Sequence, residues 1–397
     1  MPEIIPLAFF LATQASPVEI GDHTWQCPLP LSRQPQTTTN EKSVTYGDYF
    51  SVVGDFLQKN QYRAVKKALV DMFGVEADIR RVRGLAVFLV KHGEFYHPAR
   101  VVVKYGPDDV SFVINMAISQ TGRDHIKDEF NLLAGLYTEF EQPAIPRVYL
   151  LDEISSRNQN SIPLFSAQWF EGFCEFHITA NHPENRSNLI VWGQAETTSF
   201  LTSEQAEDVY RQAALILTTA YNFFTFEHIS AWHHAAGDFI LKPVDASRVD
   251  LRLITVRKVA PLIENAAPDP ATLIEALLLF LMHLTIRNRL DRLDGTGSLA
   301  WADDVAIKGT INGFFIGLEM TVRKADLPVS FPADFKNYIR SHSKTALTDL
   351  FTSVAGRIPD TSPEQAFVHK RLKNHVDLFC SLLDAGNGTE KDDTGTR

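Results

Sequence analysis

The chain has 397 residues, 45% of them hydrophobic, which is ordinary for a globular protein but more than one compact core usually holds. Its formal net charge of −10 implies no basic face, so nucleic acid is excluded as the expected partner. The three cysteines, Cys27, Cys174 and Cys380, lie too far apart for a metal motif or a disulfide framework. We therefore expect a two-lobed protein in a reducing, cytoplasmic compartment.

Residues 1–45 are rich in Pro, Thr and Gln, which predicts an extended arm. The stretch Ile4 to Ala15 is apolar, but its only early charge is Glu3, whereas a signal peptide begins with basic residues. We expect no cleaved signal peptide.

Residues 46–172 show the pattern of a first lobe, a helix packed on one antiparallel sheet. Thr121 is a plausible N-cap, because Ile126, Phe130 and Leu133 repeat behind it with helical spacing. The expected elements, in order, are a helix over Tyr49–Phe73, strands over Leu85–Val90 and Ala99–Tyr105, the helix after Thr121, and strands over Val148–Leu151 and Leu164–Phe170.

Residues 173–385 predict a mainly helical second lobe, followed by a disordered tail over residues 386–397. Thr202 and Gln205 form a capping-box pattern at the start of a helix expected to run to about Phe226. A hairpin follows, with strands over Phe239–Val244 and Val249–Val256.

Helices are expected in the remainder of this lobe. The most apolar candidate, Ala271 to Leu290, contains Glu275, His283, Arg287 and Arg289, so it reads as a buried core helix and no membrane partner is expected. Gly309, Gly313 and Gly317 are spaced by four residues, which predicts close approach of a second helix, and we expect the Ala271–Leu290 helix as their neighbour. Ser362-Pro363 predicts the start of a last helix.

Lys104 and Glu129 follow an order that phosphoryl transfer can use. That reaction needs a cation on the nucleotide phosphates, a carboxylate on magnesium and a group that orients the attacking hydroxyl. Lys104 ends an apolar strand and Glu129 lies in the helix after it, where it could pair with Lys104 and hold it in place. The ordinary alternatives are a solvated strand-end lysine and a solvated helix glutamate.

The stretch Gln168-Trp169-Phe170-Glu171-Gly172 ends the last strand of the first lobe. It resembles the hinge of the aminoglycoside phosphotransferase and choline kinase relatives of the protein kinases. The resemblance implies an α+β fold with a small antiparallel-sheet lobe and a mainly helical lobe. It also implies adenine binding at the hinge around Gln168 and Phe170, ATP and Mg²⁺ as cofactors, and Lys104 on the phosphates with Glu129 behind it.

The run Trp232-His233-His234-Ala235-Ala236-Gly237-Asp238 follows a long helix and precedes a hairpin, as the catalytic loop of this family does. In one register Asp238 matches the magnesium-binding asparagine, and His233 stands where the catalytic aspartate belongs. In the other register Asp238 is itself the catalytic base, but the metal-binding position then falls on Pro243. We favour the first register because the strand Phe239 to Leu241 follows at once.

The chain departs from the family pattern at two further points. The family's second metal-binding aspartate would fall near Leu253 to Thr255, where there is no carboxylate, and Asp250 lies three or more residues too early. A glycine-rich phosphate loop is also missing, since the first hairpin offers only Gly93.

Three readings of the function remain open at this point. The first is an ATP- and Mg²⁺-dependent phosphotransferase acting on an unidentified hydroxyl, with His233 or Asp238 as the base and Asp238 on the metal. The second is a catalytically inactive kinase-like protein that serves as a binding or scaffold module. The third is an unrelated α+β protein whose histidine pair is structural or binds a metal.

Overall fold

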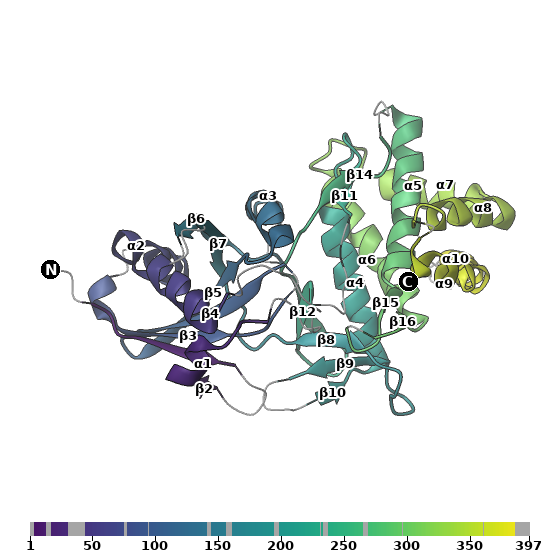
Figure 1. Cartoon of the computed structure of the whole chain (residues 1–397). Coiled ribbons are helices and arrows are strands. Elements are labelled where there is room, and N and C mark those ends of the chain that lie inside the picture. The colour runs from purple at the N-terminus through teal and green to yellow at the C-terminus, as the bar shows by residue number, and fades with distance from the viewer. Residues whose placement is uncertain are drawn as a thin grey trace, which may run out of the picture. The chain divides into compact units, whose positions relative to one another are not determined.

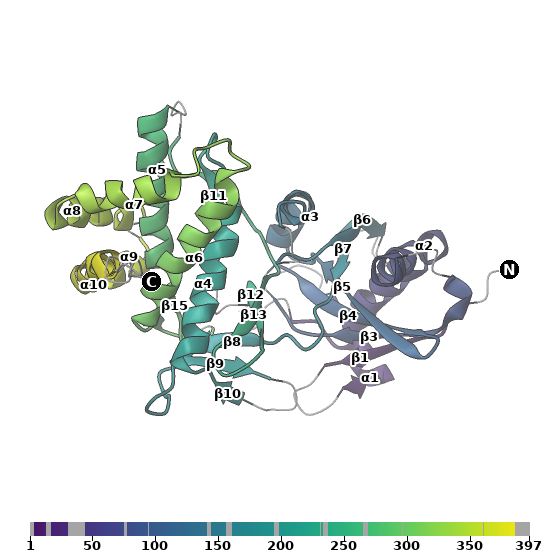
Figure 2. The same cartoon turned by 180° about the vertical axis from the view of Figure 1, so that it is seen from behind.

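The computed structural model describes residues 4–12, 17–30, 44–74, 78–93, 95–140, 144–155, 161–193, 198–230, 232, 237–264, 269–295, 297–359 and 361–385. Contacts between Cα atoms divide the chain after Gly172 into two compact units. The first is called the sheet unit and the second the helical unit, and Figures 1 and 2 show both from opposite sides.

The sheet unit contains most of the long strands and three α-helices. Its elements are β1 (Leu7–Leu11), β2 (Val18–Glu19), α1 (Asp22–Gln26), α2 (Tyr46–Phe73), a 3-10 turn (Ile79–Arg81), β3 (Val82–Leu89), β4 (His97–Tyr105), β5 (Asp108–Met116), α3 (Gln120–Tyr137), β6 (Val148–Ser155) and β7 (Ser161–Gln168).

All seven strands of this unit form one sheet in the order β2-β1-β3-β4-β5-β7-β6. Strands β3 to β7 are antiparallel throughout, whereas β1 joins parallel to β3, with Leu7 opposite Leu85. The extended arm expected at the start of the chain therefore supplies a strand.

Helices α2 and α3 cover opposite faces of the sheet. Side chains alternate between the faces of a strand, so Leu164 and Phe165 of β7 point in opposite directions. Leu164 belongs to the apolar core that α2 closes, while the Phe165 ring packs against Phe130 of α3 at 5.9 Å between centroids. Figure 1 shows both helices against the strands.

Local signals explain where α2 begins and ends. Thr45 and Asp48 form a capping box at its start, and Gly74 ends it in the left-handed conformation with φ 69°. Positive φ angles at Asn60, Gln61 and Tyr62 break the helix in the middle. Its first half, up to Gln58, is the part that carries the groove described below.

The helical unit combines six longer helices with short strands and one further short helix. Its elements are β8 (Glu175–Ile178), β9 (Leu189–Trp192), β10 (Thr198–Phe200), α4 (Ser203–Thr219), β11 (Glu227–Ile229), β12 (Phe239–Pro243), β13 (Val249–Leu253), β14 (Val259–Pro261), α5 (Pro270–Arg287), β15 (Leu290–Arg292), β16 (Leu299–Trp301), α6 (Val305–Val322), α7 (Phe331–Ser341), α8 (Lys344–Ala355), α9 (Pro363–His369) and α10 (Leu372–Ala385).

The glycine stripe of α6 faces α4, a neighbour that was not predicted. A Cβ atom on Gly313 would lie 1.9 Å from the carbonyl oxygen of Arg211, and one on Gly309 would lie 2.3 Å from that of Glu207. Only a hydrogen atom fits at these positions, so the two helices run side by side at close range (Figure 2). Helix α5 also contacts α6, so the predicted neighbours are confirmed.

Several predicted elements are confirmed and others are not. The capping box of Thr202 and Gln205 starts α4, although α4 ends at Thr219 rather than near Phe226. The β12–β13 hairpin is present, while the expected last helix is two helices, α9 and α10. Strand β5 and the small β8–β10 sheet were not predicted.

Helix α5 is long and apolar enough to cross a membrane, by length and composition alone. It is 56% buried within the protein, as expected of a core helix. With a mixed seven-stranded sheet in the first unit and a mainly helical second unit, the described chain is an α+β protein, as predicted.

Candidate functional site

Asp238 lies at the open end of the β12–β13 hairpin, directly before Phe239. Gly237 precedes it with φ 84°, a conformation that glycine adopts at no steric cost. The backbone carbonyl of Asp238 accepts a hydrogen bond from the amide of Ile254 at 2.8 Å, which extends the hairpin pairing by one step. The long helix and the hairpin that the catalytic-loop interpretation requires are therefore both present.

The carboxylate of Asp238 is 1% exposed and is held by two residues that follow β13. Thr255 donates its hydroxyl to Oδ1 at 2.7 Å, and Arg257 donates from Nη1 to Oδ2 at 2.7 Å and from Nη2 to Oδ1. This is a bidentate guanidinium–carboxylate pair, the strongest common form of charge-assisted hydrogen bond. The buried negative charge of Asp238 is therefore compensated by Arg257.

These surroundings do not suit a magnesium ion at Asp238. Mg²⁺ binds carboxylate oxygens at about 2.1 Å, which would place it within a few ångströms of the Arg257 guanidinium in a site with little water to screen the repulsion. Thr255 lies in the stretch where the family would have its second carboxylate, and Arg257 follows two residues later. Within the described part of the chain, no three His, Cys, Asp or Glu side chains are grouped to hold a metal.

Asp250 cannot serve as a free second carboxylate either. It forms a two-point ion pair with Arg252 on the same strand, β13. The Arg252 guanidinium also lies over the ring of Phe173, 5.2 Å from its centroid, which holds the pair in place. Burial lowers the pKa of Arg252, and the charge of Asp250 acts in the opposite direction.

His233 and His234 lie outside the described residues, so their predicted roles stay predictions. Trp232 is described, is 1% exposed, and accepts a hydrogen bond on its carbonyl oxygen from Arg287 of α5 at 3.1 Å. The predicted approach of Asp238 to Lys104 also stays a prediction, since the two residues belong to different units.

Lys104 does not make its predicted ion pair with Glu129. Its amine pairs instead with Asp109, the residue directly opposite on β5, and 49% of its side chain is exposed. Glu129 lies on the buried face of α3 with Ile126 and Leu133, at 1% exposure. The reason is the unpredicted β5: the strand that leads into α3 is one further along the chain than the strand carrying Lys104.

Gln168 and Phe170 are used in the packing of the sheet unit. The amide of Gln168 donates to the carbonyl of Arg147 at 2.8 Å, and its side-chain oxygen accepts from the amide of Arg147 at 3.4 Å. Phe170 is buried at 9% exposure, and Gly172 follows with φ 77°. Adenine binding by this stretch stays a prediction.

Arg100 is a polar residue near this stretch that the sequence analysis did not single out. It lies on β4, hydrogen-bonds the hydroxyl of Ser111 at 3.1 Å, and pairs with Glu171 at 2.6 Å. Its guanidinium also stacks over Trp169 at 5.4 Å. Arg100 and Lys104 lie on the same face of β4, because side chains alternate between the two faces of a strand. This alternation was the sequence pattern that could have identified Arg100 as a polar residue on that face. Through these contacts Arg100 connects the residues after β7 to β4 and β5.

Comparison with known proteins adds little to this geometry. No family model and no curated protein matches the sequence. Among solved structures the chain is similar to one described as the PAN3 pseudokinase of Drosophila melanogaster, with 9% sequence identity over 78% of this chain and 73% of that chain. The TM-score is 0.26, too low to support a conclusion, so the fold assignment depends on the order of strands and helices.

Proposed function

We propose that the chain is a kinase-like binding protein that does not transfer phosphoryl groups. The observation that carries the proposal is the pairing of Asp238 with Arg257 and Thr255. In the register favoured from the sequence, Asp238 is the carboxylate that should hold magnesium. A buried carboxylate already neutralised by a two-point guanidinium pair is a poor ligand for a second cation.

Two further features support the same proposal. Strand β5, which leads into α3, contains no lysine or arginine, and Lys104 on the preceding strand is half exposed and paired with Asp109. Asp250 is bound to Arg252, so the second metal-binding carboxylate has no replacement within the hairpin. The phosphate-binding cation and both metal ligands of an active enzyme therefore lack evident candidates among the described residues.

The experiment is a thermal-shift series on the whole chain with ATP, with and without Mg²⁺, together with an assay for phosphate release. A nucleotide at 100 times its dissociation constant stabilises the protein that binds it by about 2.7 kcal/mol. We expect no magnesium-dependent shift and no turnover. A shift that does not depend on magnesium would identify a nucleotide as the ligand of an inactive protein.

The opposite result identifies the rival function, an ATP- and Mg²⁺-dependent phosphotransferase. Magnesium-dependent stabilisation with turnover that Asp238→Asn abolishes would overturn the proposal. Asp245→Asn serves as the matched control, because Asp245 lies in the exposed turn of the same hairpin, where it pairs with Arg248.

A further inference from the structure

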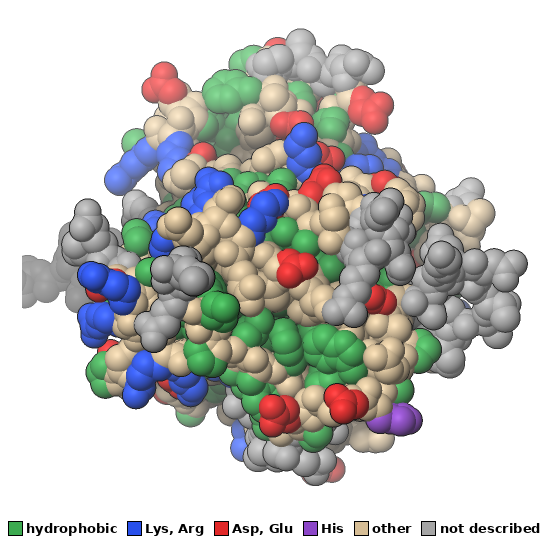
Figure 3. All heavy atoms as spheres, turned by 60° about the vertical axis from the view of Figure 1, so that its left-hand side comes forward, with side chains coloured by type: hydrophobic (Ala, Val, Ile, Leu, Met, Phe, Trp, Pro, Cys, Tyr) green, Lys and Arg blue, Asp and Glu red, His purple; other side chains and the backbone are tan. Residues whose placement is uncertain are grey.

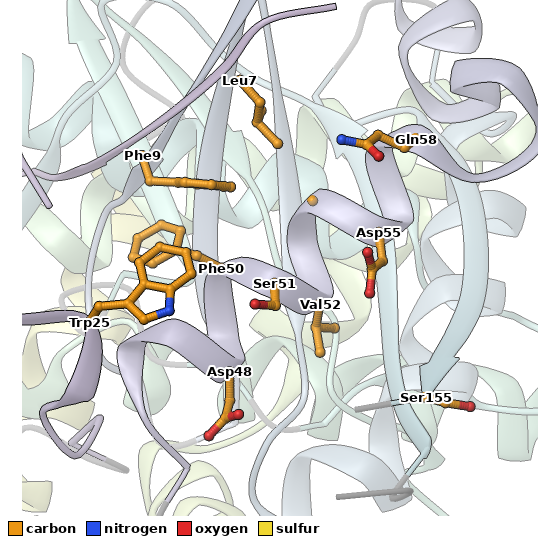
Figure 4. Close-up of a pocket in the computed structure, with 11 residues that line it drawn as sticks. Leu7, Phe9, Trp25, Asp48, Phe50, Ser51, Val52, Asp55, Gln58 and Ser155 are labelled. Atoms are coloured by element: carbon orange, nitrogen blue, oxygen red, sulfur yellow. The ribbon is translucent and has the colours of Figure 1, made fainter. Parts of the chain in front are cut away.

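A groove runs along the first half of α2 in the sheet unit (Figure 4). Its volume is about 570 Å³, and it is lined by residues of β1, α1, α2 and the end of β6. Gly54 brings β1 close to the helix here, since a Cβ atom at this position would lie 3.3 Å from the side chain of Leu7. The groove is half open, a shape that accepts side chains from a neighbouring chain.

The floor of the groove at its α1 end is aromatic. Phe9, Trp25 and Phe50 form one cluster, with centroids 5.0 Å apart between Phe9 and Phe50 and 5.7 Å apart between Phe9 and Trp25. Phe50 is fully buried, whereas Phe9 and Trp25 are partly exposed. Such a floor offers an apolar surface for one aliphatic or aromatic side chain.

The charged lining of the groove is entirely acidic, formed by Asp48 and Asp55. Asp48 is already used, because its carboxylate accepts hydrogen bonds from the backbone and hydroxyl of Thr45 in the capping box. Asp55 is exposed, and among the described residues it makes no ion pair. The free charge in the groove is therefore that of Asp55, next to Gln58 (Figure 4).

Spacing relates the aromatic floor to this carboxylate. Phe50 and Asp55 are five positions apart on α2, about 7.5 Å along the helix axis and about 140° around it at 3.6 residues per turn. A segment that reaches both the aromatic floor and Asp55 therefore crosses the helix surface, and an extended peptide needs more than the two residues that cover the axial distance alone. In the view of Figure 3, apolar side chains gather on part of the surface with separate acidic side chains near them.

We propose that this groove binds a peptide segment of a partner protein that carries an apolar residue and, a few positions away, a lysine or arginine. The apolar side chain packs on Phe9 and Trp25, and the cation pairs with Asp55. The net charge of −10 favours the approach of such a segment from a distance. The proposal extends the binding function proposed above, but it involves other residues and needs no nucleotide.

The test begins with selection of binders from a random 12-residue peptide library on the whole chain. The expected consensus is an apolar residue with Lys or Arg a few positions away. A synthetic peptide of that sequence, labelled with a fluorophore, is then titrated by anisotropy. We expect Asp55→Lys to weaken binding at least tenfold, and added salt to weaken it as well. Asp128→Lys, at an exposed carboxylate on α3, should change nothing.

Three results would overturn the proposal: a library without a basic-apolar consensus, binding that ignores Asp55→Lys, or equal loss in Asp128→Lys. A fourth is self-association of the chain, seen by sedimentation and removed by Asp55→Lys, since the occupant would then be a second copy. A negative result in the peptide experiments does not change the result of the phosphate-release assay, so the two proposals can be rejected independently.

Discussion

At the scale of single residues, Arg257 determines what Asp238 can do. A carboxylate with 1% exposure requires a compensating charge. Arg257, four residues past the end of β13, supplies it. In a magnesium site the compensating positive charge would come from the ion and would be lost when the ion dissociates. In this protein the positive charge belongs to the Arg257 side chain, so it is always present.

We predict that Arg257→Ala lowers the free energy of unfolding by about 3–5 kcal/mol, because it leaves a buried carboxylate without its partner. Urea unfolding at pH 7.5 measures the change. Arg248→Ala is the control, since Arg248 makes a similar pair with Asp245 in the exposed turn, and no measurable change is expected.

The effect of Mg²⁺ on the melting temperature is a second test of this prediction. If Asp238 were a metal ligand that Arg257 only rests against, Arg257→Ala would keep its melting temperature, and Mg²⁺ would raise it. Either observation would contradict the structural role assigned to the pair.

At the scale of elements, the sequence predicted those structures that form between residues close together in the chain. The capping box of Thr202 and Gln205 and the β12–β13 hairpin are local, and both are confirmed. Strand β5 was missed because Asp108, Asp109 and Asn115 interrupt its apolar pattern. The Gly106-Pro107 turn before it, with φ 60° at the glycine, was the signal that could have revealed it.

The candidate site could be predicted only in part for the same reason. Asp238 stands out in the sequence because small residues and a glycine precede an apolar strand. Its partner Arg257 lies beyond the end of β13, and no local pattern links the two side chains. Missing β5 also placed Lys104 on the wrong strand relative to α3, so the pairing with Glu129 did not follow.

Helix contacts yield a prediction for the glycine stripe of α6. Gly313→Ala should destabilise the protein by about 1–3 kcal/mol, because the new methyl group would overlap the backbone of α4 at Arg211. Thermal unfolding measures the loss. Gly135→Ala is the matched control: nothing lies within 4 Å of a Cβ atom there, so alanine should stabilise α3 by about 0.5–1 kcal/mol. Equal effects at both positions would rule out the close approach.

At the scale of the whole molecule, histidines whose pKa is lowered by burial make both units sensitive to acid. Burial lowers the pKa of His97 to about 4 and that of His375 to about 3. Burial also lowers the pKa of His228 and of His283, whose rings lie 5.3 Å apart; the charge of His228 further lowers the pKa of His283, and the charge of Arg357 further lowers the pKa of His228. All four are neutral in the folded protein at pH 7.

The sign of the pH dependence follows from these directions. An unfolded histidine takes up a proton near pH 6.5, while the folded one resists until its lowered pKa is reached, so stability is present above pH 6.5 and declines below it. We predict a loss of about 1.4 kcal/mol per pH unit for each such histidine between pH 6.5 and its folded pKa. Urea unfolding at pH 7.5, 6.0 and 5.0 measures the slope.

Substitution identifies the groups responsible. His97→Gln should reduce the slope between pH 6.5 and 4 by about 1.4 kcal/mol per unit, whereas His182→Gln, at an exposed position, should leave it unchanged. A slope that His97→Gln does not alter would show that carboxylates govern the acid response instead.

The parallel pairing of β1 with β3 has a consequence for biosynthesis. Leu7 finds its partner only when Leu85 has been made, and a ribosome adding about 5–20 residues per second needs roughly 4–15 s for the intervening stretch. Until then β1 can pair only with β2, through Phe10 with Glu19 and Leu11 with Val18, and its other edge stays unpaired. We expect the rate of translation through this stretch to affect the yield of folded protein.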